Sequence, residues 1–307
     1  MRRNKPSQPR SIEMTTGSLW RNILLFSLPL MLTQVLEVLF NLSDVAIAGK
    51  FAGYVALGAV GSTTLLVSLF TGLLIGMGAG VNVAIARSLG LGDDEQLERT
   101  LHTSFLICAC AGLLVCLVCA GLAGPMLRML HTKDELIDSA VSYLRIYALG
   151  LPAMAIYNFG NGVLSASGDT KRPLIYLSVA GAVNVALNLF FVIVCNLAAT
   201  GVAIASAIAQ CLSALLIVLH LLRRPDACRL QLSKLRFHRA ECRRVLMIGI
   251  LGSCVFRVAW IYTVFAYFHT IPSLYLLYIF SWAITGVAEF LYFHRSYKKY
   301  VLDARIW

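Results

Sequence analysis

Long apolar runs, and not alternating apolar and polar positions, dominate this chain. Each run approaches the roughly 20 residues that a helix needs to cross a hydrocarbon core about 30 Å thick. We expect transmembrane helices at residues 20–47, 55–84, 101–122, 140–164, 174–195, 202–222, 245–268 and 272–293. Continuous runs do not fit the alternating pattern of a membrane β-barrel. The pattern therefore predicts an all-α polytopic membrane protein with about eight transmembrane helices.

Composition agrees with this fold class. The 307 residues are 59% hydrophobic and 13% charged, and the mean hydropathy is +0.77. A soluble globular protein carries about twice that share of charged residues. The first apolar run is also longer than the apolar core of a signal peptide, so we expect an uncleaved first helix.

The formal net charge of +11 would suit a nucleic-acid partner, but the positions of the basic residues indicate a membrane topology instead. Of the 26 Lys and Arg residues, 21 lie in or beside the segments that face one side if the N-terminus is cytoplasmic. This is the positive-inside pattern. It predicts a multi-pass protein of the cell membrane, inner or plasma, with both termini cytoplasmic and no nucleic-acid partner.

One long connector divides the predicted helices into six and two. Residues 223–244 carry eight basic residues against Asp226 and Glu241, which is typical of a cytoplasmic linker lying along anionic headgroups. The predicted segments are a cytoplasmic N-terminus (1–19), a six-helix unit (20–222), the linker (223–244), a two-helix unit (245–293) and a cytoplasmic tail (294–307).

The first predicted helix carries a polar stripe. At 100° per residue, Gln34, Glu37, Asn41 and Asp44 fall within an arc of about 80°. An ionised carboxylate at mid-membrane costs at least ~2.5–3.5 kcal/mol, so the stripe should face a protein interior or a water-filled cavity. It indicates either an ion or proton site, or protonated carboxyls hydrogen-bonded between helices.

Further oxygen-bearing side chains lie on two other predicted helices. Asn184 and Asn188 share one helix face, and Ser206 follows on the next helix. Carboxylate, amide and hydroxyl oxygens suit a small hard cation such as Na⁺, with Asp44 as the charged ligand. Alternatively Asp44 could hold a proton, and the two amides could simply join helices. No other metal site is indicated.

Two other features have competing interpretations. Gly72, Gly76 and Gly80 form a repeated small-residue face, which predicts close helix packing. In the fourth predicted helix, a bend is expected at Pro152. Nearby side chains could line a cavity for aromatic cations or could simply pack in the bundle; they are Tyr147, Met154 and Tyr157.

Enzyme chemistry has little support in the sequence. It contains no P-loop, no HExxH motif, and no Ser or Cys nucleophile with an evident His partner. The six histidines lie at loops or at the ends of apolar runs, where solvated side chains are expected. We predict a protein that is not an enzyme, uses no cofactor and draws on an ion gradient for any transport.

Five motifs together resemble one known family. SLPLMLTQVLEVLFNLSDVAIAGKF, GVNVAIARSLGLGDDEQ, LSASGDTKRP, NVALNLFFV and GVAIASAIAQ occur in collinear order within residues 15–250. They are similar to the first half of multidrug and toxic compound extrusion (MATE) transporters. Each motif alone is weak, whereas five in order are specific.

The resemblance implies a fold and a function. In that family, twelve helices form two six-helix lobes, and an H⁺ or Na⁺ gradient drives export of amphipathic or cationic drugs by alternating access. Carried onto this chain, Asp44 matches the acidic residue of the first helix, and Asn184, Asn188 and Ser206 match supporting positions. Glu37 stands where a neutral residue is expected. Nothing in the sequence indicates an oligomeric state.

The end of the chain departs from the family pattern. GSCVFRVAWIYTVF and SLYLLYIFSWAITGVAEF resemble the last two helices of the family and not helices seven and eight. The sequence therefore predicts a jump across about four helices near residues 250–253, which leaves a truncated second lobe. Arg257 would lose its usual surroundings, with Glu289 as one substitute partner.

Two alternatives to a drug antiporter follow. The chain could be a non-transporting remnant or a membrane interaction module, because most of the second lobe is missing. It could also be a flippase for lipid-linked saccharides, which a strongly cationic cavity would favour. The acidic and neutral groups of the first six helices do not suit that cargo.

Overall fold

The computed structural model describes residues 19–250. This range contains the predicted six-helix unit, the basic linker and the first residues of the seventh predicted helix. The remainder of that helix, the eighth helix at 272–293, both terminal segments, Arg257 and Glu289 lie outside the described residues.

The described part of the chain is helical. Its elements are α1 (Leu19–Phe51), α2 (Gly53–Leu91), α3 (Asp94–Met129), α4 (Asp134–Ala148), α5 (Leu151–Ala166), α6 (Lys171–Leu189), η1 (Phe190–Val194), α7 (Ala198–Arg223), η2 (Leu232–Lys234) and α8 (Arg239–Ile250). Five helices are long and apolar enough to cross a membrane, or six if the bent pair α4–α5 forms one span. The all-α membrane fold is confirmed. Five of the six spans predicted for residues 20–222 correspond to long apolar helices, and the sixth corresponds to the bent pair α4–α5. Most helices extend several residues further than predicted.

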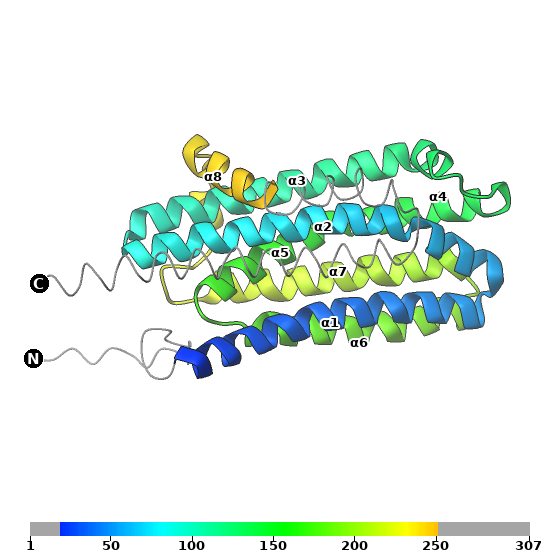
Figure 1. Cartoon of the computed structure of the whole chain (residues 1–307), viewed down its shortest axis with the longest axis horizontal. Coiled ribbons are helices and arrows are strands. Elements are labelled where there is room, and N and C mark those ends of the chain that lie inside the picture. Colours follow the sequence, from blue (N-terminus) through cyan, green and yellow to red (C-terminus); the bar gives the residue numbers. More distant parts are fainter. Residues whose placement is uncertain (1–18, 251–307) are drawn as a thin grey trace, which may run out of the picture. The chain divides into compact units, whose positions relative to one another are not determined.

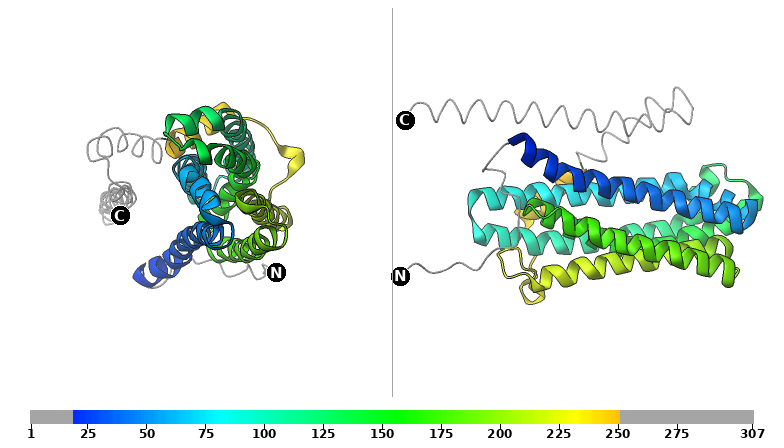
Figure 2. Two further views of the ribbon diagram at one scale, coloured as in Figure 1. Left: turned by 90° about the vertical axis from the view of Figure 1, so that its right-hand side faces the viewer. Right: turned by 90° about the horizontal axis from the view of Figure 1, so that it is seen from below.

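The long helices run side by side, and α5 and α7 lie between the other helices (Figures 1 and 2). Helix α1 packs on α6, α6 on α7, and α7 on α5, while α5 also packs on α2 and α3. Most of the large exposed side chains on α1 are apolar, including Leu24, Met31 and Val38. An apolar outer face is what a helix in contact with lipid requires.

The predicted bend near Pro152 separates two helices. Helix α4 ends at Ala148 and α5 begins at Leu151, and the two meet at an angle of 44°. Pro152 has no backbone N–H to donate to the Ala148 carbonyl, so the helical ladder is interrupted there. The bend directs α5 and its side chains toward the centre of the bundle.

A short turn fixes the start of α3. Gly92 adopts a left-handed conformation (φ 67°) at the end of α2, which glycine tolerates best. The Asp93 side chain then accepts a hydrogen bond from the Gln96 backbone N–H at 2.9 Å. This N-cap begins α3 in the motif GLGDDEQ.

The glycine face predicted on α2 packs against α8. A Cβ at Gly80 would lie 2.6 Å from the Val245 carbonyl oxygen, and one at Gly249 would lie 3.0 Å from the Gly76 carbonyl oxygen. The close helix packing predicted for this face is therefore observed at Gly76 and Gly80. A second close approach was not predicted: Gly78 leaves room for the backbone of Asn158 on α5.

The expectation of solvated histidines is wrong for His102. Its side chain is 2% exposed, because the linker returns across α3 and covers it. The two ring nitrogens lie 2.7 Å from the Glu98 carbonyl oxygen and 3.1 Å from the Gln231 backbone nitrogen. Nε2 accepts from the Gln231 N–H, so Nδ1 carries the proton that is donated to Glu98. His102 thus fastens the linker to α3.

Candidate functional site

A buried carboxylate joins three helices of the bundle. Asp44 on α1 is 6% exposed. Asn188 on α6 donates from Nδ2 to its Oδ1 at 2.6 Å, and Ser206 on α7 donates from Oγ to its Oδ2 at 2.8 Å. Each carboxylate oxygen is therefore held by a neutral donor from a different helix.

A second layer of amide contacts supports this arrangement. Asn184 donates from Nδ2 to Ser206 Oγ at 3.2 Å, and Asn188 Nδ2 also lies 3.2 Å from Asn184 Oδ1. Asn188 is fully buried, and its Oδ1 has no hydrogen-bond partner within residues 19–250. We refer to Asp44, Asn184, Asn188 and Ser206 as the Asp44 cluster. The cluster offers carboxylate, amide and hydroxyl oxygens as ligands, and among the described residues the amide oxygen Oδ1 of Asn188 has no hydrogen-bond donor.

Local structure explains why these side chains meet. Asn184 and Asn188 lie one turn apart on α6, so both face the same neighbours. Gly181, one turn earlier, provides space at which α6 approaches the Phe40 ring of α1. The π-helix η1 begins two residues after Asn188, and such wider turns are frequent at functional sites.

The electrostatics of the cluster are unusual for a buried acid. Among residues 19–250, no ion pair includes Asp44. A buried ionised carboxylate with neutral donors alone is costly, since Coulomb attraction does not offset its desolvation. The site is therefore chemically suited to bind a proton or another small cation. Within the same range no group of three or more His, Cys, Asp and Glu residues could hold a metal ion.

An open cavity of about 130 Å³ adjoins the cluster and includes Asp44, Asn184 and Ser206 in its wall. Five of the side chains expected to line a cavity do so: Glu37, Asn41, Tyr147, Met154 and Tyr157. Gln34 is half-buried and is not among the lining residues. Asn188 also lies outside the wall, directly behind Asp44.

The residues of the polar stripe on α1 differ in their surroundings. Asn41 is exposed and donates from Nδ2 to the Glu37 carbonyl oxygen at 2.9 Å, which is a bond within its own helix. Tyr157, which also lines the cavity, donates its hydroxyl proton to the Pro173 carbonyl oxygen at 3.1 Å. Within residues 19–250, Asp44 is the only residue of this stripe whose side chain bonds to another helix.

Sequence reasoning missed three polar residues of the cavity wall, one of which is Thr71 on α2. Gln210 and Ser213 lie on α7 with Ser206 and line the same cavity. Their spacing of four and seven residues from Ser206 is the signal that places them on one helix face. The buried Gln210 Oε1 has no hydrogen-bond partner in the described part of the chain.

Comparison with known proteins gives a consistent picture. The MatE family model matches residues 29–190. The Bacillus subtilis proteins "Probable multidrug resistance protein YoeA" and "Probable multidrug resistance protein YpnP" are 29% and 28% identical over 55% and 66% of this chain. A "FAD transporter" from Shewanella oneidensis is 26% identical over 57% of the chain. The matches cover 37%, 45% and 38% of those relatives, so the chain spans less than half of their length.

Solved structures support the fold. A MATE protein in a bent conformation aligns with a TM-score of 0.73 at 24% identity, covering 78% of this chain and 53% of that one. A MOP-superfamily transporter from Pyrococcus furiosus aligns with a TM-score of 0.76 at 22% identity, covering 91% and 63%. At these identities the likeness concerns the fold alone.

Proposed function

The chain belongs to the MatE family, and from this premise we propose that it acts as a cation-coupled multidrug efflux antiporter with its coupling-ion site at Asp44. The observation that carries the proposal is the buried Asp44 carboxylate, held by Asn188 and Ser206 without a basic partner in the described part of the chain. Such a group gains most from a bound cation, because the cation neutralises its charge where water cannot.

The coupling ion in this proposal is H⁺ or Na⁺. A proton would bind Asp44 directly, and Ser206 and Asn188 would then rearrange their hydrogen bonds around the neutral acid. Na⁺ would instead need several oxygen ligands, for which the side chains of Asp44, Asn184, Asn188 and Ser206 are chemically suitable. The unsatisfied Asn188 Oδ1 is one oxygen that a cation would engage.

The neighbouring cavity is the proposed place for the exported compound. Its wall combines Glu37 and Asp44 with Tyr147, Met154 and Tyr157, and among the described residues no Lys or Arg contributes to it. Carboxylates and aromatic faces both attract an amphipathic cation. The same acidic wall would repel the diphosphate of a lipid-linked saccharide, which argues against the flippase alternative.

Coupling follows from the shared wall of the two sites. Because Asp44 belongs to both the cluster and the cavity, a bound cation and a cationic drug would compete for its charge. A mutual penalty of ~1–3 kcal/mol suffices, and it acts equally in both directions. Alternating access would then bind the drug on the cytoplasmic side and exchange it for the ion outside. The positive-inside distribution of basic residues supports this orientation, since it favours a cytoplasmic position for both termini.

Drug binding to the purified full-length chain tests the ion site without requiring transport. Ethidium affinity, measured by fluorescence anisotropy, should fall about 5- to 150-fold as H⁺ or Na⁺ rises. Asp44→Asn should abolish this dependence, whereas Asp138→Asn, the same change at an exposed position of α4, should preserve it. Retained cation dependence in Asp44→Asn would remove the assignment.

The alternative of a non-transporting remnant or interaction module rests on the length of the chain, which covers less than half of its curated relatives. Proteoliposomes with an imposed cation gradient separate the two possibilities. Gradient-driven ethidium movement that disappears in Asp44→Asn supports the antiporter. Cation-sensitive binding without any gradient-driven movement supports the remnant.

A further inference from the structure

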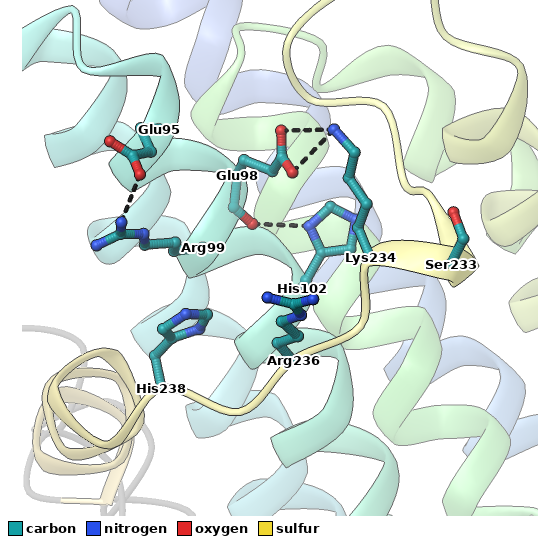
Figure 3. A pocket seen from close by; sticks show the side chains of 8 residues that line it. All are labelled: Glu95, Glu98, Arg99, His102, Ser233, Lys234, Arg236 and His238. Carbon is teal, nitrogen blue, oxygen red and sulfur yellow. Dashed lines mark hydrogen bonds and ion pairs between the residues drawn. The ribbon is translucent and has the colours of Figure 1, made fainter.

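A second pocket lies where the linker crosses the beginning of α3, at the end of the bundle opposite the α1–α2 turn (Figures 1 and 3). Its volume is about 410 Å³. The lining residues come from α3 and the linker: Glu95, Glu98, Arg99, His102, Ser233, Lys234, Arg236 and His238. We call it the linker pocket. None of its residues belongs to the Asp44 cluster or to the cavity beside it.

Hydrogen bonds hold the linker side of this pocket in place. Thr103 on α3 donates from Oγ1 to the Arg236 carbonyl oxygen at 3.1 Å and accepts from the His238 backbone N–H at 3.3 Å. His102 accepts from the Gln231 backbone N–H, as described above. The backbone on both sides of Lys234 is therefore attached to α3. These hydrogen bonds fix the linker wall of the pocket relative to α3.

Some of the charged side chains around the linker pocket have partners of opposite charge among the described residues, and one does not. Glu95 pairs with Arg99, and Glu98 pairs with Lys234 at 3.0 Å, so both carboxylates are already neutralised. Arg236 forms no side-chain hydrogen bond or ion pair within residues 19–250. Arg236 lines the pocket together with His102 and His238, and Figure 3 shows the three side chains. Among the described residues the pocket therefore offers a cation without an acidic partner, while its two carboxylates are paired.

The surroundings indicate a membrane interface. Leu232 and Phe237 are 55% and 58% exposed on the same linker, and they flank the segment that carries Lys234 and Arg236. Apolar side chains next to cations are typical of a segment at headgroup depth, where the apolar groups enter the acyl boundary and the cations meet phosphates. The linker pocket also lies near the ends of the long apolar helices α2 and α3, the part of a membrane-spanning helix that is expected at headgroup depth.

From these observations we propose that the linker pocket binds a phosphate ester through Arg236, assisted by His238. A guanidinium matches a phosphate with two parallel hydrogen bonds. The exposed Leu232 and Phe237 favour the headgroup of an anionic phospholipid as its source. A soluble phosphate ester has the same chemistry, and the experiment below distinguishes the two.

Binding of three probes to the full chain in detergent, measured by native mass spectrometry, tests the proposal. The probes are dioctanoyl phosphatidylglycerol, dioctanoyl phosphatidylcholine and sn-glycerol 3-phosphate. Arg236→Gln should weaken phosphatidylglycerol binding about tenfold, which corresponds to the loss of one charge-assisted contact. Arg243→Gln removes the same charge from an exposed position of α8 that does not line the pocket, and should change binding less than about twofold.

Each outcome decides one part of the proposal. Preference for phosphatidylglycerol over phosphatidylcholine, lost in Arg236→Gln alone, supports a lipid headgroup. Arg236-dependent binding of glycerol 3-phosphate without lipid binding supports the phosphate site and assigns a soluble source. Equal effects of Arg236→Gln and Arg243→Gln on every probe would overturn the site, since attraction would then come only from the general charge of the linker.

Discussion

The Asp44 cluster and the linker pocket both contain carboxylates, but they hold them in opposite ways. Asp44 is 6% exposed, and its oxygens are bound by the neutral donors of Asn188 and Ser206. In the linker pocket, Glu98 pairs with Lys234, and these side chains are 44% and 47% exposed. Within residues 19–250 no basic side chain pairs with the buried acid, which is why we propose a bound cation as its partner. The exposed acid is already neutralised, which leaves the positive charge of Arg236 for an anion.

This contrast shows that the same residue type can serve opposite ligands. Burial makes each hydrogen bond to Asp44 important, because a lost donor is not replaced by water. Exposure makes each ion pair of the linker pocket weak, because water and salt screen the attraction and the long side chains lose entropy. Mutations in the two regions should therefore differ in how much they change the stability of the protein, and in how far salt alters that change.

A mutation that breaks the Asp44 cluster should cause the largest loss of stability. In Asn188→Ala, Asp44 Oδ1 loses its donor, Asn184 loses a contact, and a small void forms in a fully buried position. We expect a loss of about 2–4 kcal/mol in the free energy of unfolding, measured by thermal or detergent unfolding of the purified chain.

Asn41→Ala is the matched control for this change. It removes the same amide from an exposed position of α1, where the side chain bonds only to its own helix. The free energy of unfolding should then change by about 0.5 kcal/mol or less. Equal losses in Asn188→Ala and Asn41→Ala would show that the contacts around Asp44 add no stability, and the contrast between the two regions would fail.

A mutation that detaches the linker from α3 should cause an intermediate, local loss of stability. In His102→Ala, the Gln231 backbone loses its acceptor and the linker loses one of its attachments to α3. Local opening near Arg229 should become easier by about 1–2 kcal/mol, so that limited trypsin digestion there accelerates roughly tenfold. The exposed His131 provides the control. As its φ of 54° favours Asn, His131→Asn should leave the cleavage rate unchanged. No acceleration in His102→Ala would mean that the other linker contacts suffice.

The sequence predicted the Asp44 cluster better than it predicted the linker pocket, and the reason is physical. Within an apolar helix, a polar residue such as Asp44 or Asn188 stands out, because burial in lipid is costly and partners must exist. The pocket depends on His102 meeting Gln231, which lies 129 residues later in a connector without helical periodicity. No local pattern specifies such a contact. Gly80 shows the same limit: its face predicted close packing, but its partner α8 follows the linker.

The smallest effect is expected at the Glu98–Lys234 pair, and its salt dependence separates the two regions. The coupling energy from a double-mutant cycle of Glu98→Gln and Lys234→Met should be about 0.5 kcal/mol or less, and should vanish in 1 M salt. The same cycle for Asp44→Asn and Ser206→Ala, measured at fixed pH in a salt without Na⁺ such as choline chloride, should give a larger coupling that the salt does not change, because the 2.8 Å hydrogen bond is buried and joins a carboxylate to a neutral hydroxyl. Salt-sensitive coupling at Asp44 would mean that ions reach its carboxylate freely. The site could then not restrict its charge to a single coupling ion, and the distinction between a buried cation site and an exposed, neutralised acid would disappear.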